Sequence, residues 1–171
     1  MKKSILCLAL FLGFSMSVFS QKIVLIDTEY ILKNVPAYTK ATSQLDQNSK
    51  KWQAEVEAAS NEAKQMYNSY QAKSTKLTTA QKNLQEYAIV EKEKKAADLK
   101  RKYFGPEGEL AKMRTNLMKP IQDQIYNAVK SLSERYGYSL VVDRATASSV
   151  IFASPSIDIS DDVLAKMGYS K

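Results

Sequence analysis

The chain has 171 residues, a length typical of one domain, with 25 basic and 18 acidic residues, one cysteine and no histidine. Without histidine, and with its only cysteine at position 7, it cannot form a Ser-His or Cys-His catalytic couple, and it lacks the commonest zinc ligands. No glycine-rich stretch matches a phosphate-binding loop. We therefore expect a protein that is not an enzyme and that holds no metal ion and no cofactor.

Residues 1–20 have the features of a secretory signal peptide. Two lysines precede an apolar run that ends at Phe19, and this run is short for a membrane span of about 20 residues. We predict a cut before Gln21. The exported chain would then contain no cysteine, so packing alone must hold its fold.

The next segment is short and mixed. Lys22 to Asp27 is rich in β-branched and apolar residues, which predicts a strand. We expect Thr28 to cap a short helix that ends near Lys33, and Pro36 to occupy the first turn of the following helix.

A heptad-like pattern follows, typical of a long helix in a coiled coil. A helix from Pro36 to Lys76 would be about 60 Å long at ~1.5 Å per residue. Nine of the twelve positions at the 3/4 spacing are apolar or aromatic, although the segment is strongly polar. This stripe consists of Tyr38, Thr42, Leu45, Ser49, Trp52, Val56, Ala59, Ala63, Met66, Tyr70, Lys73 and Leu77.

A turn then returns the chain beside this helix. Thr78 and Gln81 match a capping box, which predicts a second helix from Thr79 towards Phe104. Its weaker stripe contains Ile89, Ala96, Leu99 and Tyr103. We expect residues 37–114 to form an antiparallel helical-hairpin arm with its tip near 74–80.

Helix-breaking residues interrupt the return. Gly105, Pro106 and Gly108 are hinge candidates, and we expect a kink there to re-aim the chain where the arm approaches the body. The same residues fit equally well a rigid boundary, at which one helix ends and another begins. Pro120 should kink the next helix or open it at its first turn.

The C-terminal part is more apolar. An amphipathic helix should end at Gly137, and Tyr138–Asp143 and Val150–Ala153 predict two strands joined as a hairpin. We expect Ser160 to cap a last helix. The tyrosines expected in the core of this part are Tyr126, Tyr136 and Tyr138.

The fold class is thus α+β and mostly helical, with a small sheet in a body formed by residues 21–36 and 115–171. A body this small gains only about 3–5 kcal/mol from one core, and its sheet would have open edges. We therefore expect it to oligomerise through the body. The candidate residues are Val24, Ile26, Leu140, Val142 and Ile151.

Several strings resemble the Skp/OmpH family of periplasmic chaperones across nearly all of residues 21–171. They are "KIVLID", "NVPAYTKATSQL", "YFGPEGELAKMRTNLMKPIQDQIYNAV" and "GYSLVVDRATASSVIFASPSIDISDDVLAKMG". The resemblance is specific at the two ends and generic in the arm.

This resemblance implies a periplasmic homotrimer shaped like a jellyfish, in which helical hairpins enclose a cavity. Unfolded outer-membrane β-barrel proteins would be held there without ATP, aided by the basic arm, since residues 41–114 contain 14 basic and 10 acidic residues. A membrane surface or lipopolysaccharide is left open as a further partner, without assigned residues. The client-contact candidates are Met66, Tyr67, Tyr70, Lys73, Lys76, Lys82 and Tyr87.

Two other functions fit less well. A structural coiled-coil protein of the cell envelope, without client-holding activity, is the main alternative. The only feature that favours a nucleic-acid binder is the excess of basic over acidic residues. The charges alternate in sign along the chain, and no motif that recognises a nucleic acid is present. We expect no nucleic-acid partner.

Overall fold

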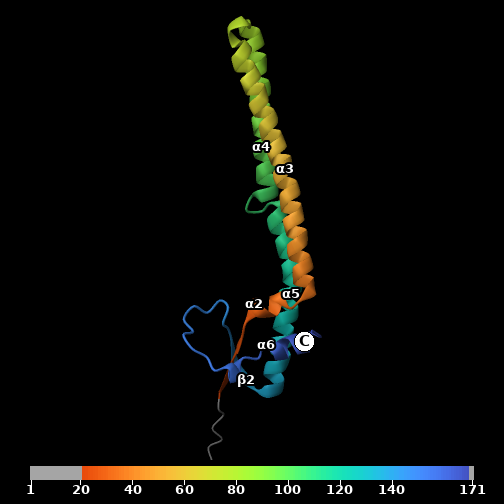
Figure 1. Cartoon of the computed structure of the whole chain (residues 1–171), viewed down its shortest axis with the longest axis vertical. Helices are drawn as coiled ribbons and strands as arrows, with labels where there is room; N and C mark the ends of the chain where they lie inside the picture. Colours follow the sequence, from red (N-terminus) through yellow and green to blue (C-terminus); the bar gives the residue numbers. More distant parts are fainter. Residues whose placement is uncertain (1–20, 170–171) are drawn as a thin grey trace, which may run out of the picture.

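A long helical arm rises from a small mixed body (Figure 1). The computed structural model describes residues 21–169, so the predicted signal peptide and its cut before Gln21 lie outside the described residues. Within residues 21–169, no helix combines the length and the apolar character needed to cross a bilayer. The α+β, mostly helical fold class is confirmed.

The arm is the antiparallel hairpin that the heptads predict. Helix α3 (Pro36–Lys73) leads through a 3₁₀ turn, η1 (Ser74–Lys76), to α4 (Thr79–Phe104). The Thr78–Gln81 capping box begins α4 as expected. Every predicted stripe position of the first helix is buried or half-buried except Lys73, and Ile89, Ala96 and Tyr103 are buried on the returning helix.

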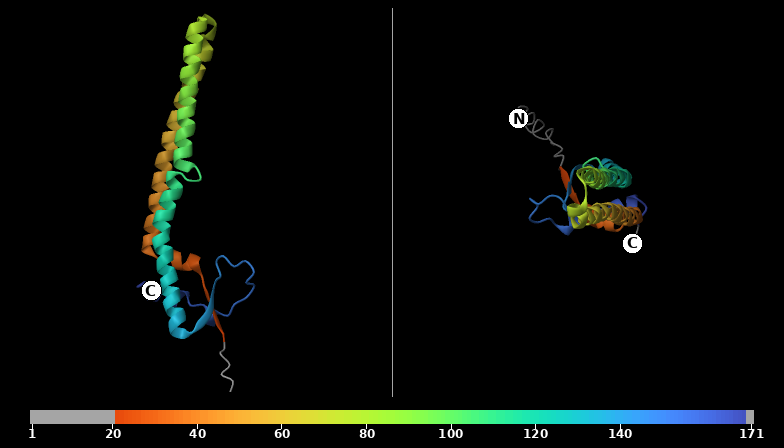
Figure 2. Two further views of the ribbon diagram at one scale, coloured as in Figure 1. Left: turned by 180° about the vertical axis from the view of Figure 1, so that it is seen from behind. Right: turned by 90° about the horizontal axis from the view of Figure 1, so that it is seen from above.

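The break interrupts the arm part-way along its length. Helix α4 ends at Phe104, and α5 (Glu109–Tyr136) begins after a loop of four residues that projects sideways (Figures 1 and 2). Helix α5 then continues along α3. The expected re-aiming of the chain at the root of the arm is therefore wrong, because both returning helices pack on the same long helix. Pro120 lies inside α5 and does not open it.

The sheet differs from the predicted hairpin. Strand β1 (Lys22–Ile26) pairs in parallel with β2 (Tyr138–Asp143), and the whole arm forms the crossover between them. Residues 150–153 are not a strand. The Asp143 carboxylate accepts the backbone N–H of Ala145 at 3.1 Å and the Thr146 hydroxyl at 3.0 Å, which turns the chain away from the β2 edge.

The other side of β1 is covered by the C-terminal segment. After η2 (Pro155–Ile157), the Ile159 N–H donates to the carbonyl of Leu25 at 2.9 Å, and α6 (Ser160–Lys166) follows. Ser160 does not cap this helix, because its hydroxyl donates to Asp158 and accepts the Asp27 N–H. Thr28 likewise does not cap α2 (Thr28–Lys33), since the Asp27 side chain does so by accepting the Tyr30 N–H.

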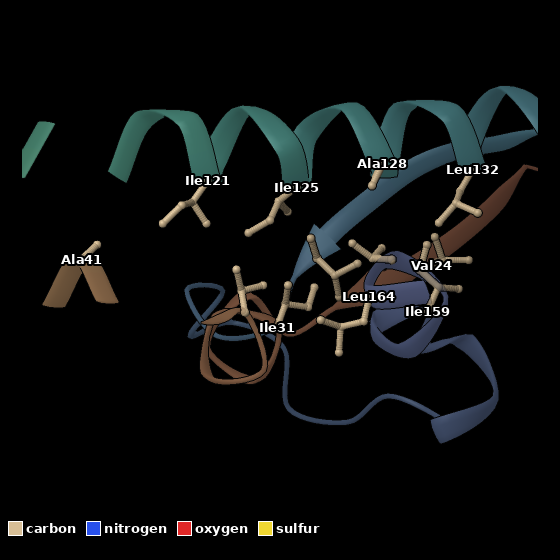
Figure 3. Close-up of a cluster of buried hydrophobic side chains, with 12 residues drawn as sticks. Val24, Ile31, Ala41, Ile121, Ile125, Ala128, Leu132, Ile159 and Leu164 are labelled. Atoms are coloured by element: carbon tan, nitrogen blue, oxygen red, sulfur yellow. The ribbon is translucent and has the colours of Figure 1, made fainter. Parts of the chain in front are cut away.

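The body has one compact core below the arm. One face of α5 contributes Ile121, Ile125, Ala128 and Leu132, which point towards α2, β1 and α6 (Figure 3). Of the tyrosines expected there, Tyr138 packs against the core. Tyr126 and Tyr136 do not, with 66% and 44% of their surface exposed. Tyr126 lies off the buried face of α5, and Tyr136 is the last residue of this helix, one turn beyond Leu132. The core thus belongs to the base of α5, and the arm extends from it.

Candidate functional site

The end of the arm carries its excess positive charge. Residues 63–85 contain four lysines and no acidic residue, whereas the remainder of 41–114 contains ten basic and ten acidic residues. Lys73 and Lys76 are exposed at the turn, and Lys82 is half-buried at the start of α4. The distal end therefore attracts anionic groups more strongly than the rest of the arm.

A groove between α3 and α4 lies just below this turn, and we call it the tip groove. Its apolar members include Met66, Leu84 and Ala88, with Lys73 at its margin. Leu84 is 75% exposed, and Tyr87, one turn further along α4, is 69% exposed. Of the predicted client contacts, the structure thus brings Met66 and Lys73 together in this groove, whereas Tyr87 does not line it and follows Leu84 by three residues on α4.

Leu84 is absent from the predicted contact set, although a signal for it existed. It lies off the seam stripe of a strongly polar helix, so the coiled coil cannot bury it. An unburied leucine at such a position indicates a contact outside the hairpin. Of the apolar residues of α4 that lie off the stripe, the predicted contact set contained Tyr87 but not Leu84.

A second hollow, the mid-arm groove, lies nearer the body. It is lined by Val56, Ala63, Lys64, Tyr67 and Lys100, together with small residues and Glu93. Tyr67 therefore belongs to a different surface from Met66. Tyr70 belongs to neither groove, since its hydroxyl donates to the Glu86 carboxylate across the hairpin.

The break is closely packed. The ring of Tyr103, in the last turn of α4, stacks on Trp52 with centroids 5.1 Å apart, and its hydroxyl donates to Glu55 at 2.5 Å. This hydrogen bond raises the pKa of Tyr103, because ionisation would place two negative charges together. Both loop glycines have negative φ, and a Cβ at Gly105 would lie 2.4 Å from the Arg101 carbonyl oxygen. They supply room for the backbone, and their role as a hinge stays a prediction.

The predicted oligomer residues divide into two groups. Val24 and Ile26 are buried in the protomer's own core, so a second copy cannot reach them. Leu140 is exposed, Val142 is half-buried on the same strand, and Ile151 is 99% exposed in the loop after β2. Phe152 beside it is also exposed. Only the strand and loop residues can therefore face another chain.

No group of three or more carboxylate, histidine or cysteine side chains within residues 21–169 is arranged to hold a metal ion. The hollows of the arm are open grooves, and they contain lysines, one glutamate each, and apolar residues, with Tyr67 in the mid-arm groove. Such surfaces suit the binding of a flexible chain better than the chemistry of a small substrate.

Comparisons with known proteins agree with this architecture. The chain is 26% identical over 159 residues to the chaperone protein Skp of Yersinia enterocolitica, and the match covers 92% of either chain. Its fold is similar to a crystal structure from Caulobacter crescentus CB15, described as an OmpH-like outer-membrane chaperone. That match has a TM-score of 0.68 at 14% identity, over 86% of this chain and 83% of the other. The family model described as outer membrane protein (OmpH-like) matches residues 22–167, and the chain belongs to this family of OmpH-like chaperones.

Proposed function

We propose that this protein is an ATP-independent periplasmic holdase, which captures unfolded outer-membrane β-barrel proteins between basic arms and prevents their aggregation. One observation carries the proposal: the distal arm combines unpaired positive charge with exposed apolar side chains that the hairpin itself cannot bury. An unfolded chain offers matching apolar groups, and charge attraction speeds its capture if it is acidic.

The assembly that we propose is a homotrimer in which three bodies join and three arms surround a cavity. The exposed Leu140, Ile151 and Phe152 support it, as does the unpaired outer edge of β2. Export follows from the signal peptide expected at residues 1–20. Mass spectrometry of the protein recovered from the cell envelope tests the cut before Gln21.

Holdase activity is tested by diluting a urea-denatured outer-membrane β-barrel protein into buffer with the purified full-length chain, without nucleotide. We expect light scattering from aggregates to be suppressed near one assembled chaperone per client. Raising the salt concentration should weaken capture, because it screens the attraction between the lysines and the client. Precipitation at the same rate as without the protein would refute the proposal.

The alternative is a structural coiled-coil protein of the envelope. Such a protein should retain one folded partner and show no affinity for denatured chains. The leucine exposed in the tip groove favours the holdase, because a coiled coil that serves only as a spacer has no need of it.

A further inference from the structure

The two sides of the distal arm differ in chemistry. On α4, Leu84, Ala88 and Lys95 follow one another at spacings of four and seven, so they lie on one side of the helix. On the other side of the helix lie Glu93, Ala97 and Lys100, at spacings of four and three residues. The seam with α3 separates these sides, which correspond to the tip groove and the mid-arm groove.

The side with the tip groove combines apolar and cationic surface in one continuous path. Ala88 lines the tip groove and also a second hollow, whose lining holds four lysines and two carboxylates, Glu91 and Asp98. Among the described residues, Lys94 and Lys95 have no carboxylate within salt-bridge distance, whereas Lys92 is bound by Glu62. Apolar contact near the tip thus passes into a surface of net positive charge towards the body.

We propose that this path is the client-facing side of the arm, and that it binds an extended segment in which bulky apolar side chains are followed by acidic ones. The inference rests on the proposed holdase function and names the segment that the site selects. From Leu84 to Lys95 the path is about 16 Å long on the helix, which matches about five residues of extended chain.

The opposite side has these features to a smaller extent. The mid-arm groove holds two lysines and one glutamate, so its net positive charge is smaller than that of the hollow beside Ala88, and most of its uncharged lining residues are small. Tyr67 is its one large exposed apolar side chain. This side can therefore bind a client through its net charge but offers no apolar path.

The probe is a fluorescein-labelled synthetic peptide with alternating tyrosine and leucine followed by an aspartate stretch, titrated with the full-length protein by anisotropy. Leu84→Gln combined with Tyr87→Gln should raise the Kd about tenfold or more, since two large apolar contacts are lost. The control is Val90→Gln, compared with Leu84→Gln alone, because Val90 is exposed on the same helix and lines neither groove. Its Kd should stay within about twofold of the wild-type value.

The lysines allow a second matched comparison. Two double variants remove the same net charge from opposite sides of the arm. The first combines Lys94→Gln with Lys95→Gln, and the second combines Lys64→Gln with Lys100→Gln. The first pair should weaken binding of the aspartate peptide several-fold more than the second. It should have little effect on a peptide with asparagine in place of aspartate. Circular dichroism of each variant confirms that helix content is retained.

Equal effects from both sides would overturn the inference, because capture would then depend on overall charge and apolar content alone. That result would leave the holdase proposal intact, provided that the wild-type protein still keeps a denatured β-barrel protein soluble. If the wild-type protein fails in that assay, the proposed function itself fails.

Discussion

Arg144 joins three segments of the body at the residue scale. Its guanidinium donates to the Asp27 carboxylate at 2.9 Å, after β1, and lies 3.7 Å from Asp158, before α6. Asp143, at the end of β2, accepts both the N–H and the hydroxyl of Thr28. These bonds connect both strands with α2 and α6, so they fix the base from which the arm extends.

The carboxyl groups of this network have lowered pKa values. Backbone hydrogen bonding from Tyr30, followed by the side-chain bond from Arg144, lowers the pKa of Asp27. Burial alone would raise the pKa of Asp143, but hydrogen bonds from Thr28 and its neighbours keep it below the ordinary value. Both groups therefore favour the folded state in their charged form.

Acid should weaken the body for this reason. A carboxyl whose folded-state pKa lies below its unfolded value stabilises the fold above the unfolded pKa and loses that contribution as pH falls through the folded pKa. We predict that the melting temperature falls steeply below the ordinary aspartate pKa of about 4. Asp27→Asn should lower the melting temperature at neutral pH and flatten its decline in acid. A parallel decline in both proteins, followed by calorimetry, would contradict this role.

The helix caps show which residue-level features the sequence does not determine. Thr28 and Ser160 are good N-cap residues, and both lie at helix starts as predicted. Each hydroxyl bonds a residue more than a hundred positions away instead, to Asp143 and Asp27 respectively. The residue preferences at helix starts predicted the positions of both helices correctly. Hydrogen bonds to distant residues determine which side chain caps each helix. The Thr78–Gln81 box was predictable because both its partners are local.

At the scale of elements, periodicity predicted the arm and missed the sheet. The heptad stripe specifies which face each helix buries, so α3 and α4 were recognisable from composition and spacing. The parallel pairing of β1 with β2 joins residues over a hundred positions apart, and the sequence of neither strand indicates which strand it pairs with. Residues 150–153 have strand composition, but the turn held by Asp143 directs the chain away from the edge of β2. The same limit applies to the site, since two predicted contacts in α3 proved to lie on different surfaces.

The break between α4 and α5 depends on close backbone contact. The Gly105 N–H donates to the Arg101 carbonyl at 2.9 Å, and a Cβ at this position would lie 2.4 Å from that oxygen. Gly105→Ala should therefore open the last turn of α4 and release Tyr103 from Trp52, at a cost of about 1–3 kcal/mol in arm stability. Trp52 is the only tryptophan, so its emission should shift to longer wavelength.

Pro106→Ala provides the control, because Pro106 is exposed in the same loop. We expect it to leave the emission of Trp52 and the urea unfolding midpoint nearly unchanged. If Gly105→Ala matches this control in both measurements, the loop is tolerant and the close contact has no structural role. X-ray scattering of the two variants additionally measures the spread of the arms, which the hinge hypothesis requires to change.

At the scale of the whole molecule, a small base supports a much longer arm. The core of the body lies between one face of α5 and the short elements α2, β1 and α6. Cores of this size contribute only about 3–5 kcal/mol, while the polar seam of the arm adds little. We propose that the base gains the remaining stability by joining other copies through the exposed apolar residues on β2 and the following loop.

Leu140→Asp combined with Ile151→Asp tests this assembly. Both side chains are exposed in the protomer, so the substitutions should leave its own fold intact while placing charges in the proposed interface. We predict that light scattering coupled to size exclusion gives a trimer mass for the wild type and a monomer mass for the variant. The variant should also melt at a lower, concentration-independent temperature, because assembly no longer stabilises the base. A Tyr87→Gln variant on the arm should keep the trimer mass. An unchanged mass after the aspartate substitutions would place the interface elsewhere on the body.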